Sequence, residues 1–300
     1  MAETVFDQAS RRAVRLDPPG FFAWLLTNFA VVLRFVRWLD TRTTPRPGGR
    51  EPTADTVAEL QGVQQAGPPW LFPVEFQTEP DPDMFGRLLV QMGNSWQQLR
   101  PDPEPGSRYQ LGAAVVNLTG SSKSAPASRV YQLPGDDDLL CGGRFRERHL
   151  AEESADATLT RIENKELSRV LLVFVPAMQG SGEDGIIKRW LSVASQEQDP
   201  HLRAEYAGLA LVLAHLKDWA TAWKSALKEW NMREAEIVKE WKREERIETL
   251  RETLRYLLQD HFGALPEEWL RRIEAVSDPD RLQQAVRQAP KLTKLEELSL

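Results

Sequence analysis

Cysteine is almost absent from this chain of 300 residues, in which Cys141 stands alone. A single thiol excludes an internal disulfide and fits a reducing compartment, so we expect a cytoplasmic protein. The four histidines are scattered, and no Cys/His spacing predicts a zinc site. The sequence also lacks a glycine-rich phosphate loop, a GxSxG elbow and an HExxH helix, which removes the usual signals of nucleotide-binding proteins, serine hydrolases and zinc proteases.

Positive charge is not in excess either. The formal net charge is -6, which argues against broad non-specific binding of polyanions, so nucleic acid would need a local basic patch. The first fifty residues favour such a patch, because they carry eight arginines against four acidic residues. With 41% hydrophobic residues, the chain is ordinary for a globular protein and long enough for one large domain or two modest ones.

An uninterrupted apolar run of membrane-spanning length is missing. The most apolar stretch covers residues 20–39, and four polar side chains break it: Thr27, Asn28, Arg34 and Arg37. We interpret this stretch as one buried or groove-lining helix that follows a first helix over residues 3–16. The alternative is a helix that lies on a membrane surface. We expect no membrane partner.

Residues 70–76 (WLFPVEF) are an apolar run that follows a Gly-Pro-Pro turn, which is typical of a buried strand. Glu75 and Gln77 are two positions apart, so they project from the same face of that strand. A carboxylate inside a buried strand is costly unless it has a partner or a metal ion. Glu75 is therefore the residue that most needs an explanation.

Asp55 begins a second strand-like run, residues 55–60, and residues 62–69 between the two runs indicate a hairpin loop. Pairing of the two strands would bring Asp55 close to Glu75. Two carboxylates suit Mg²⁺ or Mn²⁺, since such an ion keeps much of its hydration shell and takes one or two protein carboxylates. The chemistry that follows is metal-assisted hydrolysis of a phosphodiester.

Asp55 and the Glu75-x-Gln77 triplet resemble the D…(D/E)xK core of the PD-(D/E)XK nuclease superfamily, with Gln77 in the place of the lysine. More narrowly, VEFQTEPDPDMFGRLL (residues 74–89) is similar to the signature of the recombination-promoting nuclease and transposase family. The resemblance implies an α/β fold, a restriction-endonuclease-like mixed central sheet flanked by helices. It also implies that Asp55 and Glu75 bind the metal, that Gln77 holds the nucleophilic water and that Asp7 is an accessory acidic residue.

The sequence departs from the family's pattern at two places. Pro73 stands where a histidine is common, and Gln91 stands where a tyrosine often follows the Arg-Leu-Leu triplet. Because Gln77 cannot take a proton from water, the alternative to a DNA endonuclease is an inactive relative that serves as a DNA-binding or protein-interaction module. For an active enzyme, we expect four arginines to contact phosphate: Arg87, Arg42, Arg46 and Arg50.

The remaining elements follow from periodicity and turn residues. We predict a helix over residues 84–99, a central strand over 109–118, a short strand over 130–133 and a strand covered on both faces over 170–175. No strand signal survives after residue 185. The tryptophans at 219, 223 and 230 share a helix face and are interpreted as core.

We therefore expect a nuclease-like α/β domain over residues 1–180 and an all-helical remainder. Residues 181–260 would form a helical extension whose last part has a narrow apolar seam, typical of a coiled coil or of an arm that makes a homo-oligomer. Residues 261–300 would form a small helical domain. Its sequence FGALPEEWLRRIEAV is similar to an uncharacterised C-terminal domain often joined to this nuclease family.

Overall fold

The structure, a computed structural model, describes residues 5–28, 32–39, 56–63, 67–79, 81–101, 107–120, 127–132, 140–228, 230, 236–263, 265–292 and 294–298. The chain forms two compact units, Met1–Met232 and Arg233–Leu300. The predicted boundary at residue 180 lies inside the first unit, and the predicted boundary at residue 260 lies inside a helix of the second.

The first unit is built on a mixed six-stranded sheet in the order β1-β2-β3-β5-β8, with β4 also beside β3. β1, β2 and β3 are antiparallel to one another in turn, whereas β4, β5 and β8 run parallel to β3. A separate antiparallel hairpin consists of β6 and β7. The strands are β1 (Leu33–Trp38), β2 (Thr56–Gly62), β3 (Trp70–Gln77), β4 (Gln110–Leu111), β5 (Ala114–Asn117), β6 (Arg129–Gln132), β7 (Leu140–Gly143) and β8 (Arg146–His149).

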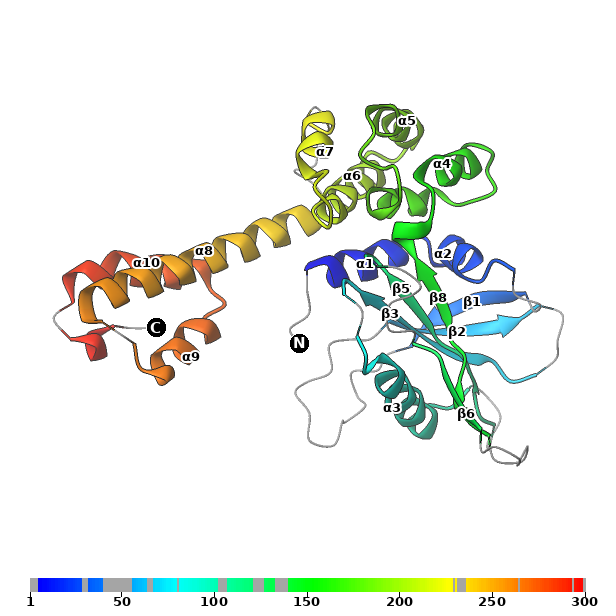
Figure 1. Cartoon of the computed structure of the whole chain (residues 1–300), viewed down its shortest axis with the longest axis horizontal. Helices are drawn as coiled ribbons and strands as arrows, with labels where there is room; N and C mark the ends of the chain where they lie inside the picture. Colours follow the sequence, from blue (N-terminus) through cyan, green and yellow to red (C-terminus); the bar gives the residue numbers. More distant parts are fainter. Residues whose placement is uncertain are drawn as a thin grey trace. The chain divides into compact units, whose positions relative to one another are not determined.

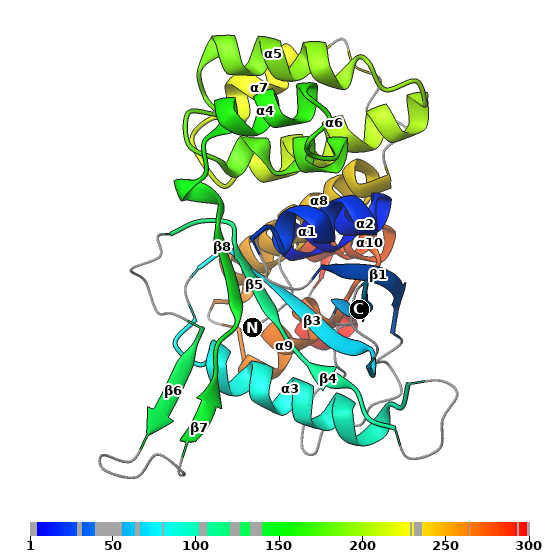
Figure 2. The same cartoon turned by 90° about the vertical axis from the view of Figure 1, so that its right-hand side faces the viewer.

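Helices cover both faces of this sheet. Figures 1 and 2 show α1 and α2 on one face, α3 on the other, and α4 to α7 in a further layer beyond α1 and α2. This arrangement confirms the predicted α/β class with a mixed central sheet between helices. The helices are α1 (Val5–Leu16), α2 (Pro18–Leu25), α3 (Met84–Gln98), α4 (Ala155–Glu163), α5 (Asp184–Ala194), α6 (Pro200–Ala214) and α7 (Ala220–Ala226).

Side chains of β3 are buried on both faces, which is why its sequence is almost continuously apolar. Phe76 faces α1 and α2, and its ring centroid lies 6.2 Å from that of Phe21 in α2. On the other face, Met84 and Leu88 of α3 pack with Val115 of β5. Glu75 is thus placed between two apolar layers.

Several predicted elements are confirmed. β2 and β3 pair as the expected hairpin, with Thr56 opposite Val74 and Leu60 opposite Trp70. The predicted helix over 84–99 is α3, and the predicted short strand over 130–133 is β6. Among the described residues, no strand follows β8, as expected for the region after residue 185.

The prediction of a single helix over residues 20–39 is wrong. α2 ends at Leu25, Asn28 adopts a left-handed backbone (φ 67°), and Leu33–Trp38 forms β1 against β2. β1 packs against α2 through one set of its alternating side chains, so the chain reverses direction between the two elements. The rings of Phe35 and Phe22 stack there with centroids 5.7 Å apart. No helix in the described part of the chain has the length and apolarity needed to cross a membrane.

The predicted strand over residues 170–175 is also wrong. This run is fully buried, as expected, but it forms two 3₁₀ turns, Arg169–Val173 and Val175–Ala177. A short continuous apolar run does not distinguish a strand from a buried helical turn. The Ser168 hydroxyl accepts the Val170 N–H and so begins the first turn.

The predicted strand over residues 109–118 is interrupted and forms β4 and β5. Gly112 lies between them, and a Cβ on Gly112 would come 2.8 Å from ring atoms of Phe72. The prediction that three tryptophans share one helix face is wrong, because α7 contains only Trp223. Trp223 is fully buried, as expected for core, and lies edge-to-face against Trp190. Trp219 is 40% exposed.

The second unit contains three helices and two 3₁₀ turns around one apolar core. The elements are α8 (Glu236–Phe262), α9 (Glu267–Ala275), α10 (Pro279–Gln288) and the turns Ala289–Lys291 and Leu295–Glu297. Gly263 ends α8 with a positive φ of 78°, and Asp278 caps α10 through the Asp280 N–H. Ile247 and Leu254 from the predicted seam of α8 lie in this core, and oligomer formation stays a prediction.

Candidate functional site

Glu75 and Gln77 project from β3 on the face that α3 covers. Glu75 pairs in register with Val115, and Val115 packs against the apolar side chains of α3. Both polar residues are nearly inaccessible, at 6% and 7% exposed. A buried carboxylate and a buried amide therefore lie side by side at the carboxyl end of β3.

Arg87 of α3 provides positive charge next to Glu75. Its Nη2 atom lies 3.5 Å from Glu75 Oε2, and its Nη1 atom lies 2.7 Å from Asp81 Oδ2. Burial raises the pKa of Asp81, but the Asp83 N–H and the Arg87 guanidinium outweigh it, so the net pKa is lowered. Because the Arg87 side chain is 51% exposed, it reaches solvent while it contacts the buried carboxylate.

Gln77 begins a polar row that crosses three parallel strands. It pairs with Asn117 of β5, and Asn117 pairs with His149 of β8. Asn117 Nδ2 donates to the carbonyl of Arg148 at 3.4 Å. The Nε2 atom of Gln77 and the Nδ1 atom of His149 are both buried and have no hydrogen-bond partner among the described residues.

Side chains of β8 alternate between the two faces of the sheet. Arg146 and Arg148 donate to backbone carbonyls of α2 and its C-cap region, so they face away from α3. Glu147 and His149 consequently face the same side as Glu75 and Gln77. Glu147 Oε2 lies 3.9 Å from His149 Nε2.

Ser128 holds the other oxygen of Glu147. Both its backbone N–H and its hydroxyl donate to Glu147 Oε1, at 3.2 and 3.1 Å. The carboxylate is therefore fixed, with one oxygen occupied and the other directed at the imidazole of His149. Residues held in this way by neighbouring donors have a defined orientation.

The structure brings together only some of the residues that the sequence predicts for the site. Glu75, Gln77 and Arg87 lie next to one another. Asp7 is half-buried on α1, which lies on the opposite face of the sheet in Figure 2. The other predicted site residues lie outside the described residues: Asp55, Arg42, Arg46 and Arg50.

Among the described residues, Glu75 and Asp81 are the carboxylates that contact Arg87 at this place. Within the described ranges, no three His, Cys, Asp or Glu side chains lie close enough to hold a metal ion. Glu75 is a hard oxygen donor, and the neighbouring side chain on its face of β3 is Gln77, whose Nε2 atom has no partner in the described part of the chain. Mg²⁺ needs only one or two protein carboxylates beside water, so Glu75 fits as one of its ligands.

Sequence reasoning missed Asn117, Glu147 and His149. Residues 146–149 read Arg-Glu-Arg-His, so the strand has no apolar alternation that would reveal it. The alternation of the two arginines with Glu147 and His149 was the only local signal. It becomes informative once the pairing of β8 with β5 is known.

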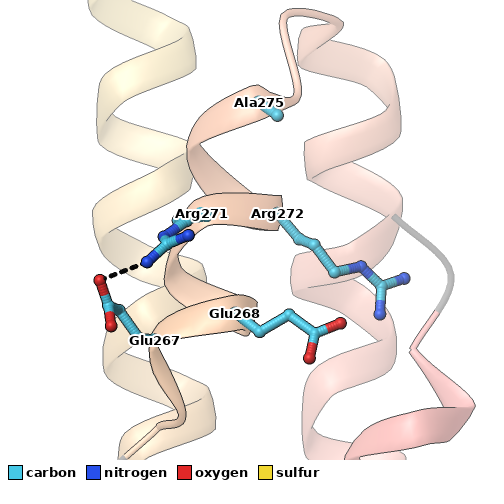
Figure 3. A pocket seen from close by; sticks show the side chains of 5 residues that line it. All are labelled: Glu267, Glu268, Arg271, Arg272 and Ala275. Atoms are coloured by element: carbon cyan, nitrogen blue, oxygen red, sulfur yellow. Dashed lines mark hydrogen bonds and ion pairs between the residues drawn. The ribbon is translucent and has the colours of Figure 1, made fainter.

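The second unit has a hollow along α9, shown in Figure 3, lined by Glu267, Glu268, Arg271, Arg272 and Ala275. Three of its charged side chains, Glu267, Arg271 and Arg272, have partners on the same helix. Glu267 Oε1 accepts from Arg271 Nη2 at 2.6 Å, and both side chains are more than 70% exposed. The Arg272 guanidinium lies 4.1 Å from the ring centre of Trp269. Solvated pairs of this kind are a common helix surface and indicate no ligand site.

Comparisons of this chain with models of known protein families, with curated proteins and with solved structures found no match.

Proposed function

We propose that this protein is a Mg²⁺-dependent DNA endonuclease that hydrolyses phosphodiester bonds, with its site at the carboxyl end of β3. The observation that carries the proposal is the placement of Glu75, Gln77 and Arg87, which supplies a buried carboxylate, a buried amide and a partly exposed cation within one neighbourhood. Metal-dependent nucleases need these three kinds of group to hold the ion, the water and the phosphate.

Asp55 is the second carboxylate in this proposal. The described part of β2 starts at Thr56, which pairs with Val74, the residue before Glu75. Val57 and Glu59 lie opposite Pro73 and Leu71, and thus on the Glu75 face. Asp55 itself lies outside the described residues, so its role in the proposal rests on the resemblance of Asp55 and the Glu75-x-Gln77 triplet to the nuclease core.

Each residue then has a distinct task. Asp55 and Glu75 would hold the metal, and Mg²⁺ when bound supplies a Lewis acid that polarises the phosphate and acidifies water. The amide of Gln77 donates a hydrogen bond that orients the nucleophilic water. The exposed side of the Arg87 guanidinium steadies the scissile phosphate, since charge-assisted hydrogen bonds to phosphate are strong.

A plasmid-nicking assay tests the proposal. Wild type should nick supercoiled DNA with Mg²⁺ and not with EDTA, and Asp55→Asn and Glu75→Gln should each lose at least about 100-fold of the rate. Asp184→Asn is the matched control, because that carboxylate is 81% exposed on α5. Calorimetric titration with Mg²⁺ and Mn²⁺ should show binding that Glu75→Gln weakens.

Absence of any metal-dependent nicking, with normal folding and no affinity for either ion, would reject the enzyme. The alternative, a nuclease-like fold that binds DNA or protein without catalysis, is favoured by one feature, the amide of Gln77, which has no basic group. DNA affinity that is unchanged by Mg²⁺ and by Glu75→Gln would support this alternative.

A further inference from the structure

A base is missing from the residues assigned so far. The Gln77 amide can orient a water molecule but cannot take its proton at neutral pH. Hydrolysis of a phosphodiester by water requires that the attacking oxygen lose a proton. The row Gln77–Asn117–His149 contains one side chain able to accept it, the imidazole of His149.

We propose that His149, oriented by Glu147, is the proton acceptor of this site and shares a bound water molecule with Gln77. This inference rests on the proposed nuclease function. In the step, the water O–H bond breaks and its proton moves to His149 Nδ1, while the water oxygen bonds to phosphorus. The P–O ester bond breaks, the departing alkoxide takes a proton from solvent water, and His149 then gives its proton to the hydroxide left in solvent.

The hydrogen-bond inventory supports the assignment. Buried polar groups in proteins are nearly always paired, and an unpaired one is destabilising. Gln77 Nε2 and His149 Nδ1 are two buried nitrogens on one row of the same face, and neither has a partner within the described ranges. One is a donor, and the other is an acceptor when the ring carries its proton on Nε2. Water can satisfy both at once, because it accepts from the first and donates to the second.

Glu147 sets the tautomer that this requires. Its Oε2 atom lies 3.9 Å from His149 Nε2, while Ser128 occupies Oε1. The negative charge of the carboxylate on the Nε2 side favours the proton on Nε2, which leaves the buried Nδ1 as the acceptor. A carboxylate that orients a histidine and stabilises its protonated form is the general arrangement of an activated base.

Gln77 and His149 are separated by one strand of the sheet, which contributes Asn117 to the row. Adjacent strands lie about 4.8 Å apart, so the Cα atoms of Gln77 and His149, two strands apart, are separated by about 10 Å. Their side chains stand on the same face of the sheet. The Asn117 amide between them is held by the backbone of β8 through its bond to the Arg148 carbonyl.

The first test does not depend on activity. Nitrogen-15 NMR of labelled histidine should show His149 with its proton on Nε2, and Glu147→Gln should change that signal. His149→Ala assigns the signal, because only four histidines are present. A wild-type ring that carries its proton on Nδ1, or a signal that Glu147→Gln leaves unchanged, would overturn the inference.

The second test is kinetic. His149→Ala should lower kcat for nicking about 100-fold with duplex affinity within about twofold, and free imidazole should restore part of the rate. Glu147→Gln should lower kcat less, and His201→Ala, an exposed histidine on α6, should change nothing. Thermal melts identify any variant that does not fold. If His149→Ala does not fold, the kcat of Glu147→Gln tests the acceptor role in its place. Equal kcat in His149→Ala and wild type would refute the acceptor role.

The two proposals can fail separately. A wild type that never nicks DNA fails the proposed function, and the tautomer of His149 then still decides whether Nδ1 is an acceptor. A wild type that nicks DNA through Glu75, with kcat independent of His149 and Glu147, keeps the proposed function and rejects the base.

Discussion

Replacing Arg12 by alanine should destabilise the first unit by about 3 kcal/mol. Arg12 of α1 binds Glu205 of α6 through two contacts, Nε to Oε2 at 2.8 Å and Nη2 to Oε1 at 3.0 Å. The Glu205 side chain is only 1% exposed. Removing one partner of a buried ion pair costs about 3–5 kcal/mol, because the remaining charge stays desolvated. We expect the lower end, since the Arg12 side chain is 28% exposed.

Calorimetric melting measures this change. A loss of about 3 kcal/mol corresponds to a fall in Tm of about 6–12 °C for a unit of this size. Arg15→Ala is the control on the same helix. Its guanidinium is exposed and lies 5.9 Å from the ring of Trp38, so Tm should fall by about 2 °C or less.

A double variant separates the ion pair from packing. Arg12→Met with Glu205→Met should recover most of the lost Tm, because an apolar pair removes the buried charge. A single Arg12→Ala variant that melts within 1 °C of wild type would refute the reasoning. So would a double variant that is as unstable as the single one.

Three further predictions concern other parts of the chain. Burial and the Glu59 carboxylate raise the pKa of Tyr109 to about 12. The stability that comes from this raised pKa is present below about pH 10 and is lost as the pH rises toward 12. In urea unfolding, the free energy of unfolding should fall by up to about 2 kcal/mol over this range, and Tyr109→Phe should flatten that pH dependence. Leu254→Ala should lower the melting stability of the second unit by about 2–5 kcal/mol, whereas Tyr256→Ala, 68% exposed on the same helix, should cost under about 1 kcal/mol. Arg87→Gln should raise Mg²⁺ affinity up to about fivefold in calorimetric titration while it slows nicking, because a half-exposed cation opposes the ion and contacts the phosphate. Unchanged affinity and rate would contradict that role.

Local pattern was enough to predict the centre of the fold. The run from Trp70 to Phe76, the hairpin before it and the helix from Met84 all follow from side-chain period and turn residues. The same period placed Glu75 and Gln77 on one face, and the structure confirms that placement by their pairing with Val115 and Asn117.

The local sequence pattern gave the wrong secondary structure in two apolar segments, where a helix and a strand have similar signals. Residues 20–39 carry enough apolar side chains for a continuous helix, and only the pairing of β1 with β2 requires the chain to leave the helix after Leu25. The buried run at 170–175 has no neighbouring strand to pair with, so it closes its own hydrogen bonds as 3₁₀ turns.

The sequence by itself determined that a carboxylate and an amide lie side by side on a buried strand, because alternation along a strand is a property of neighbouring residues. Only the tertiary structure decided what lies beside them. Asn117 and His149 reach the row of Gln77 because β5 and β8 align in parallel with β3, although 40 and 72 residues separate them from it in the chain. Pairing between strands so far apart depends on how the helices between them pack, and no local period in the sequence records it.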